Sequence, residues 1–212
     1  MRRLPVYLLI DTSGSMRGEP IESVNAGLRT LVASLRQDPS AIETVHLCII
    51  TFDRVVQVIC PLESVESFQV PLIETPESGP THTGAALELL CQRYDGDIVQ
   101  STPDQKGDWS PLLFLMTDGS PSDGMKYNEM AAAVRSRKFG IIVGCAAGPH
   151  AKTESLRLLT DQVFHLDTAD QALFAQYFKW VSASIAAGNV SMGSTAELVL
   201  PPPPPGLNPT VI

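Results

Sequence analysis

Oxygen-bearing side chains gather in three short segments of this 212-residue chain. Asp11, Ser13 and Ser15 follow one apolar run, and Asp118 follows another. The stretch Gly79–Gly84, which contains Thr81 and Thr83, leads into a third segment, which has helical periodicity. Carboxylate and hydroxyl oxygens suit a hard divalent cation such as Mg²⁺ or Mn²⁺, whereas zinc prefers cysteine and histidine. These residue types therefore indicate a divalent-cation site.

The spacing in the first segment supports this interpretation. In an extended chain, residues i, i+2 and i+4 point the same way, so Asp11, Ser13 and Ser15 are expected to converge. Gly14 would let the backbone curl around the ion. The pattern D-x-S-x-S also occurs by chance, and such loops are often turns or helix caps. The inference depends on all three segments occurring together.

The elements that would position these segments alternate between strands and helices. Strands are expected at residues 4–10, 45–52, 55–60, 111–117, 139–147 and 162–166. Helices are expected at 20–35, 82–94, 123–138, 152–160 and 169–187, with irregular or exposed chain at 61–80 and 95–110. This order predicts an α/β fold with a doubly wound, mostly parallel sheet, one antiparallel edge strand and helices on both faces. Ligands bind such sheets at the carboxyl ends of the strands, where the three polar segments fall.

The length and pattern predict one folded domain at residues 1–187, followed by a tail at 188–212. The tail lacks helical or strand periodicity and contains five consecutive prolines, Pro201–Pro205. Such a run favours the polyproline II conformation, and we expect the tail to be partly exposed to solvent.

Charge and cysteine content exclude several classes of partner. The chain has 15 Lys and Arg residues against 23 Asp and Glu residues, a formal net charge of -8, and no basic cluster. Binding to nucleic acid or to an anionic membrane is therefore not expected. The apolar run at 4–10 is short and contains Pro5, so we interpret it as a strand rather than a signal peptide or a membrane span. The four scattered cysteines predict free thiols and a cytoplasmic location.

Three stretches of the sequence resemble the signatures of a von Willebrand factor A domain. They are VYLLIDTSGS at 6–15, GPTHTGAAL at 79–87 and LFLMTDG at 113–119, and the resemblance extends over about residues 4–187. In that family these signatures build a metal-ion-dependent adhesion site. The resemblance implies a metal-dependent module that binds a protein partner and needs no catalysis.

The resemblance also implies a role for each candidate ligand. The hydroxyls of Ser13, Ser15 and Thr81 would bind Mg²⁺ or Mn²⁺, while Asp11 and Asp118 would act directly or through water. A partner Asp or Glu would complete the coordination shell.

Within the family, the opening segment and the stretch TDGSPSD at 117–123 are similar to the TerY-type proteins of bacterial tellurium-resistance systems. This similarity implies a scaffold in a phosphorylation-linked stress response. A protein kinase or a protein phosphatase of the same system would then be the partner.

An enzyme is the alternative interpretation. A strand that ends in aspartate also opens the haloacid-dehalogenase phosphotransferases, in which that aspartate is the nucleophile. Ser13 stands where those enzymes have a second acid, so the general acid–base group is missing. A metal-dependent phosphotransferase or phosphatase using Asp11 is therefore the second hypothesis. Near Asp118, Ser122 and Asp123 either border the metal face or cap the following helix.

Overall fold

The computed structural model describes residues 2–77, 79–148, 151–166, 171–191, 200–205 and 207. Within these residues the chain forms a six-stranded sheet with the order β3-β2-β1-β4-β5-β6. Neighbouring strands are parallel except for β2 and β3, which are antiparallel at one edge. The predicted fold class is confirmed. The strands are β1 Leu4–Asp11, β2 Val45–Phe52, β3 Val56–Ser64, β4 Leu112–Thr117, β5 Ile141–Ala147 and β6 Val163–Leu166.

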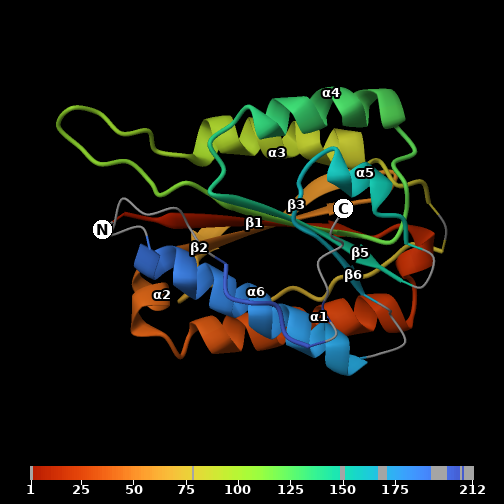
Figure 1. Ribbon diagram of the computed structural model, residues 1–212, viewed down its shortest axis with the longest axis horizontal. Helices are drawn as coiled ribbons and strands as arrows, with labels where there is room; N and C mark the ends of the chain where they lie inside the picture. Colours follow the sequence, from red (N-terminus) through yellow and green to blue (C-terminus); the bar gives the residue numbers. More distant parts are fainter. Residues whose placement is uncertain are drawn as a thin grey trace.

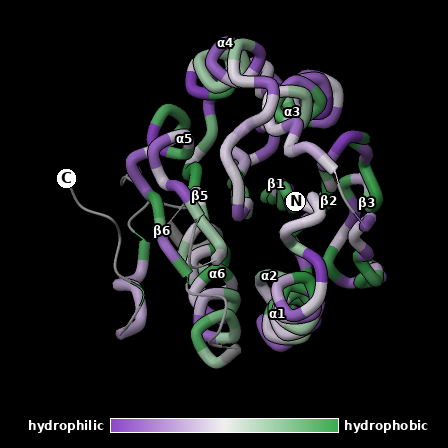
Figure 2. The backbone as a smooth tube through the Cα atoms, turned by 90° about the vertical axis from the view of Figure 1, so that its right-hand side faces the viewer, coloured by the Kyte–Doolittle hydropathy of each residue, from purple (hydrophilic) through white to green (hydrophobic). Residues whose placement is uncertain are grey.

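Helices cover both faces of the sheet (Figure 1). On one face lie α3, α4 and α5, and on the other lie α1, α2 and α6. A short 3-10 helix, η1, spans Gly14–Met16. The helices are α1 Glu19–Leu35, α2 Pro39–Thr44, α3 Thr83–Asp97, α4 Gly124–Arg135, α5 Glu154–Arg157 and α6 Gln171–Ser191. Figure 2 shows the apolar segments concentrated between these two layers. No helix in the described part of the chain is long and apolar enough to cross a membrane.

The central strand β1 shows why a continuous apolar run predicts a strand in a sheet of this kind. All eight of its residues are buried. Side chains alternate between the two faces of a strand, so Val6 and Leu8 join one core cluster while Tyr7 and Leu9 join the other. With helices on both faces, neither side of β1 can be polar.

The edge strand β3 is longer than predicted. We expected irregular chain from residue 61, but the strand continues through Pro61 to Ser64. Proline lacks an N–H group and is tolerated at a sheet edge. The pairing of β3 with β2 shifts register between Leu47 and Ile49, which is the irregularity that accommodates it.

Several helix boundaries also differ from the predictions. We expected Asp38 and Pro39 to end α1, but α1 already ends at Leu35. These two residues instead begin α2, where the Asp38 carboxylate accepts the Ser40 N–H at 2.9 Å. The helix predicted at 152–160 contains only the single turn α5. At the carboxyl end, α6 continues past residue 187 to Ser191, and its predicted first residues, 169–170, lie outside the described residues.

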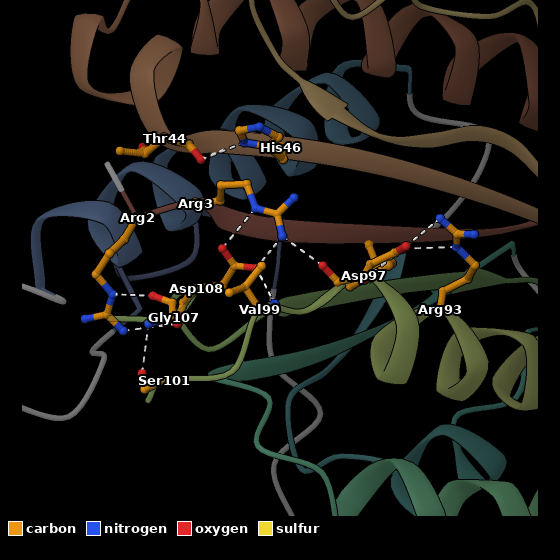
Figure 3. Close-up of polar contacts among 11 residues, drawn as sticks. Arg2, Arg3, Thr44, His46, Arg93, Asp97, Val99, Ser101, Gly107 and Asp108 are labelled. Carbon is orange, nitrogen blue, oxygen red and sulfur yellow. Dashed lines mark hydrogen bonds and ion pairs between the residues drawn. The ribbon is translucent and has the colours of Figure 1, made fainter. Parts of the chain in front are cut away.

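The segment predicted as an exposed loop at 95–110 begins as the last turn of α3 and is then anchored by the N-terminus (Figure 3). The Arg3 guanidinium donates to both oxygens of Asp108, at 2.9 and 2.6 Å. Arg2 donates to the Gly107 carbonyl at 2.7 Å and stacks 3.4 Å from the ring centroid of Trp109. Residues 99–106, which lie between the end of α3 and these anchored residues, remain exposed. This anchored loop lies at the opposite end of the sheet from the carboxyl ends of the parallel strands (Figure 1).

Candidate metal-binding site

Asp11 is the last residue of β1 and joins two neighbouring strands at their carboxyl ends. It is fully buried. Its Oδ2 accepts a hydrogen bond from the Thr117 hydroxyl at the end of β4, at 2.5 Å. Its Oδ1 accepts the backbone N–H of Ser13 at 2.8 Å. The Asp11 carboxylate therefore fixes the first polar loop against β4, and both of its oxygens are occupied in doing so.

Ser13, Ser15 and Asp118 lie together in front of this buried carboxylate. The two serine hydroxyl oxygens are 3.2 Å apart, and the Ser15 hydroxyl donates to Oδ1 of Asp118 at 2.9 Å. The structure thus brings together residues that are far apart in the sequence, as the motif spacing predicts.

The backbone conformation that brings Ser13 and Ser15 together differs from the expected one. Ser13 is still extended, but the chain then turns into η1, where the Met16 N–H donates to the Ser13 carbonyl at 2.9 Å. Ser15 therefore lies in a 3-10 turn, so the prediction of an extended path through all three residues was wrong. Gly14 does not use the positive φ region either, which among the described residues is adopted by Gly18 and Gly148.

Thr81 reaches the site from the loop before α3. Its backbone exchanges two hydrogen bonds with Ser122: the Thr81 N–H donates to the Ser122 hydroxyl at 3.0 Å, and the Ser122 N–H donates to the Thr81 carbonyl at 2.8 Å. A Cβ atom added to Gly119 would lie 3.3 Å from the Thr81 hydroxyl oxygen. That hydroxyl therefore lies at the turn that carries Asp118. Both hydrogen bonds between Thr81 and Ser122 use the Thr81 backbone, which leaves the Thr81 hydroxyl oxygen for a ligand.

Asp123 supports the site in a way that the sequence did not reveal. We expected Ser122 or Asp123 to border the metal face or to cap the following helix, α4. Instead the Asp123 carboxylate accepts the N–H groups of Gly84 and Ala85, at 3.0 and 2.9 Å. Both N–H groups lie in the first turn of α3, where the helix itself offers them no acceptor. The loop that carries Asp118 is thereby tied to the helix that follows Thr81.

Burial shifts both carboxylates of the site towards the neutral form by raising their pKa values. Burial raises the pKa of Asp11 to about 6, the hydrogen bonds from Thr117 and Ser13 oppose that shift, and the nearby charge of Asp118 adds to it. Burial also raises the pKa of Asp118, against the hydrogen bond from Ser15. A divalent cation would favour the charged form of both groups.

The donor set fits Mg²⁺. Neighbouring ligands of an octahedral Mg²⁺ at ~2.1 Å lie about 3 Å apart. The spacing of 3.2 Å between the serine hydroxyls and of 2.9 Å between Ser15 and Asp118 matches that requirement. Among the described residues, no group of three or more His, Cys, Asp and Glu side chains could hold a metal. A site here would therefore rely on hydroxyl ligands as well as carboxylates.

Comparison with known protein families gives a match over most of the chain. Residues 6–176 match the family model for the von Willebrand factor type A domain. The chain belongs to this family. Domains of this family are generally metal-dependent protein-interaction modules. Sequence comparison with curated proteins finds no significant match.

Solved structures with this fold include three from different sources. A von Willebrand factor type A protein from Catenulispora acidiphila has a TM-score of 0.67 and 16% identity over 88% of this chain and 43% of its own. Proximal thread matrix protein 1 from the mussel byssus has a TM-score of 0.64 and 16% identity over 87% and 48%. The pilus adhesin SpaC from Lactobacillus rhamnosus GG has a TM-score of 0.67 and 13% identity over 88% and 31%. The chain thus spans less than half the length of each of these proteins.

Proposed function

We propose that this von Willebrand factor type A domain binds Mg²⁺ or Mn²⁺ at the carboxyl edge of its sheet and captures a protein partner through that ion. Ser13, Ser15 and Thr81 bind the ion directly. Asp11 and Asp118 supply charge and orientation, Asp11 from its fully buried position behind the serines. The observation that carries the proposal is the contact between Ser15 and Asp118, since it sets two ligands of different loops at the spacing of an octahedral ion.

The partner supplies an Asp or Glu carboxylate to the ion. With hydroxyl ligands in the majority, the bound ion keeps much of its charge and readily accepts a further oxygen. The chain carries a net charge of -8, so its overall field repels an acidic partner. The ion is then the local attraction that overcomes this repulsion, and binding is lost when the ion is removed.

The geometry of Asp11 favours this function over phosphotransfer. A nucleophilic carboxylate needs an oxygen that faces the substrate. Asp11 has no exposed surface, and its two oxygens accept hydrogen bonds from Thr117 and Ser13. These contacts suit a group that orients the loop and contributes charge.

Partner capture in Mg²⁺ and in EDTA tests the proposal. The immobilised chain should retain a partner from extracts of its own cells in Mg²⁺ and release it in EDTA. Asp118→Ala should capture nothing in either buffer, whereas Asp104→Ala, in the exposed loop at the other end of the sheet, should behave as the parent does. Capture by Asp118→Ala that survives EDTA would contradict the proposal.

We extend the proposal to the cellular context. The likeness of residues 2–15 and 117–123 to TerY-type proteins supports a cytoplasmic scaffold in a phosphorylation-linked stress system of the tellurium-resistance type. A protein kinase or phosphatase should then be among the proteins that EDTA releases. Mass spectrometry of that fraction tests this, and a fraction without either enzyme would count against the context while leaving the metal site intact.

A further inference from the structure

The Pro-rich tail contacts its own domain through Trp180 of α6. The Trp180 Nε1–H group donates to the Pro201 carbonyl at 2.9 Å. Trp180 is only 4% exposed, and its ring packs against Phe164 of β6 with the ring centroids 4.8 Å apart. The indole is thus held by the core, and its N–H group is directed at the tail.

Leucines anchor the proline run at both ends. Leu200 packs against the core cluster that contains α1 and α6 residues, and Leu207 is a member of that cluster with 1% exposure. The Leu207 N–H also donates to the Pro204 carbonyl at 3.0 Å. Between these anchors the five prolines have φ fixed near the polyproline II value and no N–H groups to satisfy.

A cavity of about 670 Å³ lies between the tail and the domain. Residues 200–203 form one wall, and Phe139, Ile141 and Phe164 contribute apolar side chains to another. Arginines and other polar residues complete the lining: Arg135, Arg137, Arg157, Thr160, Asp161 and Gln162. Gly140 and Gln162, which precede β5 and β6, place the cavity at the amino ends of these strands, away from the metal site. Figure 2 shows the described part of the tail beside β6 and α6. The prolines therefore form one wall of this groove.

We infer that this groove is a receptor for a proline-rich segment and that the chain's own tail, residues 200–205, lies along it. An aromatic wall and an indole N–H that donates to a proline-run carbonyl are what polyproline II recognition requires. The ligand class is a proline run flanked by leucines, because the leucines enter the core and the prolines span the groove. This inference is independent of the proposed metal function, and it gives the domain a second binding surface at the other end of its sheet.

Fluorescence of Trp180 tests the inference in the full-length chain. The chain has two tryptophans, so Trp109→Phe leaves Trp180 as the single indole reporter. In that background, replacing Pro201–Pro205 by Gly-Ser-Gly-Ser-Gly should shift the Trp180 emission to the red and increase its quenching by acrylamide. A synthetic peptide of residues 200–207 should then reverse both changes saturably, and a peptide with serine at the five proline positions should not.

The chain with its own prolines is the matched control. A tethered segment has an effective concentration of the order of millimolar, so the same peptide at about 0.1 mM should leave its emission unchanged. Equal responses of the two proteins to the peptide, or unchanged quenching on removal of the prolines, would overturn the inference. Mg²⁺ binding should be the same in both proteins, which separates this inference from the metal proposal.

If the Gly-Ser chain fails to fold, a second variant tests whether Trp180 holds the tail. Trp180→Phe keeps an aromatic ring in the core but removes the N–H donor to the tail. Exchange of the Leu207 amide hydrogen, measured by NMR, should then become about three- to tenfold faster, which is the expected effect of one lost hydrogen bond. An unchanged exchange rate would show that Trp180 does not hold the tail.

Discussion

The Ser15 hydroxyl donates a 2.9 Å hydrogen bond to Asp118, which lies 103 residues further along the chain. This bond joins the loops after β1 and β4, which are neighbours only because the two strands are adjacent and parallel. It holds the two candidate ligands at the spacing that an octahedral ion needs.

Ser122 should affect metal binding without touching the ion, because its hydroxyl accepts the Thr81 N–H. Ser122→Ala leaves the Thr81 loop less firmly held, and loss of such a supporting contact typically weakens metal binding about 10- to 100-fold. Calorimetric titration with Mg²⁺ measures this. The exposed neighbour Ser120 is the matched control, and Ser120→Ala should bind as the parent does. Equal affinities of the two variants would contradict the role assigned to Ser122.

Asp123 should stabilise the fold through α3. Asp123→Ala removes the acceptor for the Gly84 and Ala85 N–H groups, and loss of a helix cap costs about 0.5–2 kcal/mol. Urea unfolding of the metal-free chain measures the free energy of unfolding. Asp104→Ala, in the exposed loop, should change it by less than about 0.5 kcal/mol. A similar small value for Asp123→Ala would show that the cap is not needed.

Through Asp11, lowering the pH should increase the stability of the chain without metal and decrease its affinity for Mg²⁺. Its pKa is about 6 in the fold against the ordinary value of 3.8, so the folded state binds the proton more tightly than the unfolded state. Its contribution to the stability of the metal-free chain therefore rises as pH falls from 7 towards 4. Protons compete with Mg²⁺ for the same carboxylate, so metal affinity should decrease over that range.

Comparison with Asp11→Asn isolates this effect, since other carboxylates titrate in both proteins. The parent should gain stability relative to Asp11→Asn as the pH of metal-free samples is lowered, measured by urea unfolding at each pH. A stability difference that stays constant from pH 7 to pH 4 would show that the Asp11 pKa is not raised.

Gly27 of α1 is needed for the packing of α1 against α6. A Cβ atom at this position would lie 2.0 Å from Cδ2 of Phe178, which is closer than any real contact. Gly27→Ala should therefore destabilise the chain by about 1–3 kcal/mol, measured by urea unfolding. Gly96 in α3 has no atom within 4 Å of such a Cβ, and Gly96→Ala should instead stabilise the chain by about 0.5–1 kcal/mol. Equal effects of the two substitutions would contradict this packing argument.

The strand pattern was predictable because burial on both faces leaves a strong signal. The run 4–10 has no polar position, and its end at Asp11 marks the carboxyl edge of the sheet where the polar loops meet. Parallel pairing of β1 with β4 then accounts for the approach of Ser15 to Asp118. The strands and their polar ends follow from residue type and chain order, whereas the adjacency of β1 and β4 was not predicted and comes from the structure.

Other contacts left no comparable signal. The path of residues 13–15 depends on a 3-10 turn, which local spacing does not distinguish from an extended segment. Asp123 has the residue type of a cap for the helix that follows it, and only the packing of α3 against α4 redirects its carboxylate. The tail was expected to be partly exposed, and Pro202 and Pro205 are exposed. The burial of Leu207 in the core was not predicted, because one leucine after a proline run carries no periodicity.

Calorimetric titration of the purified, metal-free chain with Mg²⁺ tests the central claim most directly. The parent and Asp104→Ala should each bind one ion per chain at the same affinity. Asp118→Ala and Ser15→Ala should bind at least about tenfold more weakly while keeping the circular dichroism of the parent. Unchanged Mg²⁺ binding by both site variants, or no binding by the parent, would contradict the assignment of this edge of the sheet as the metal site.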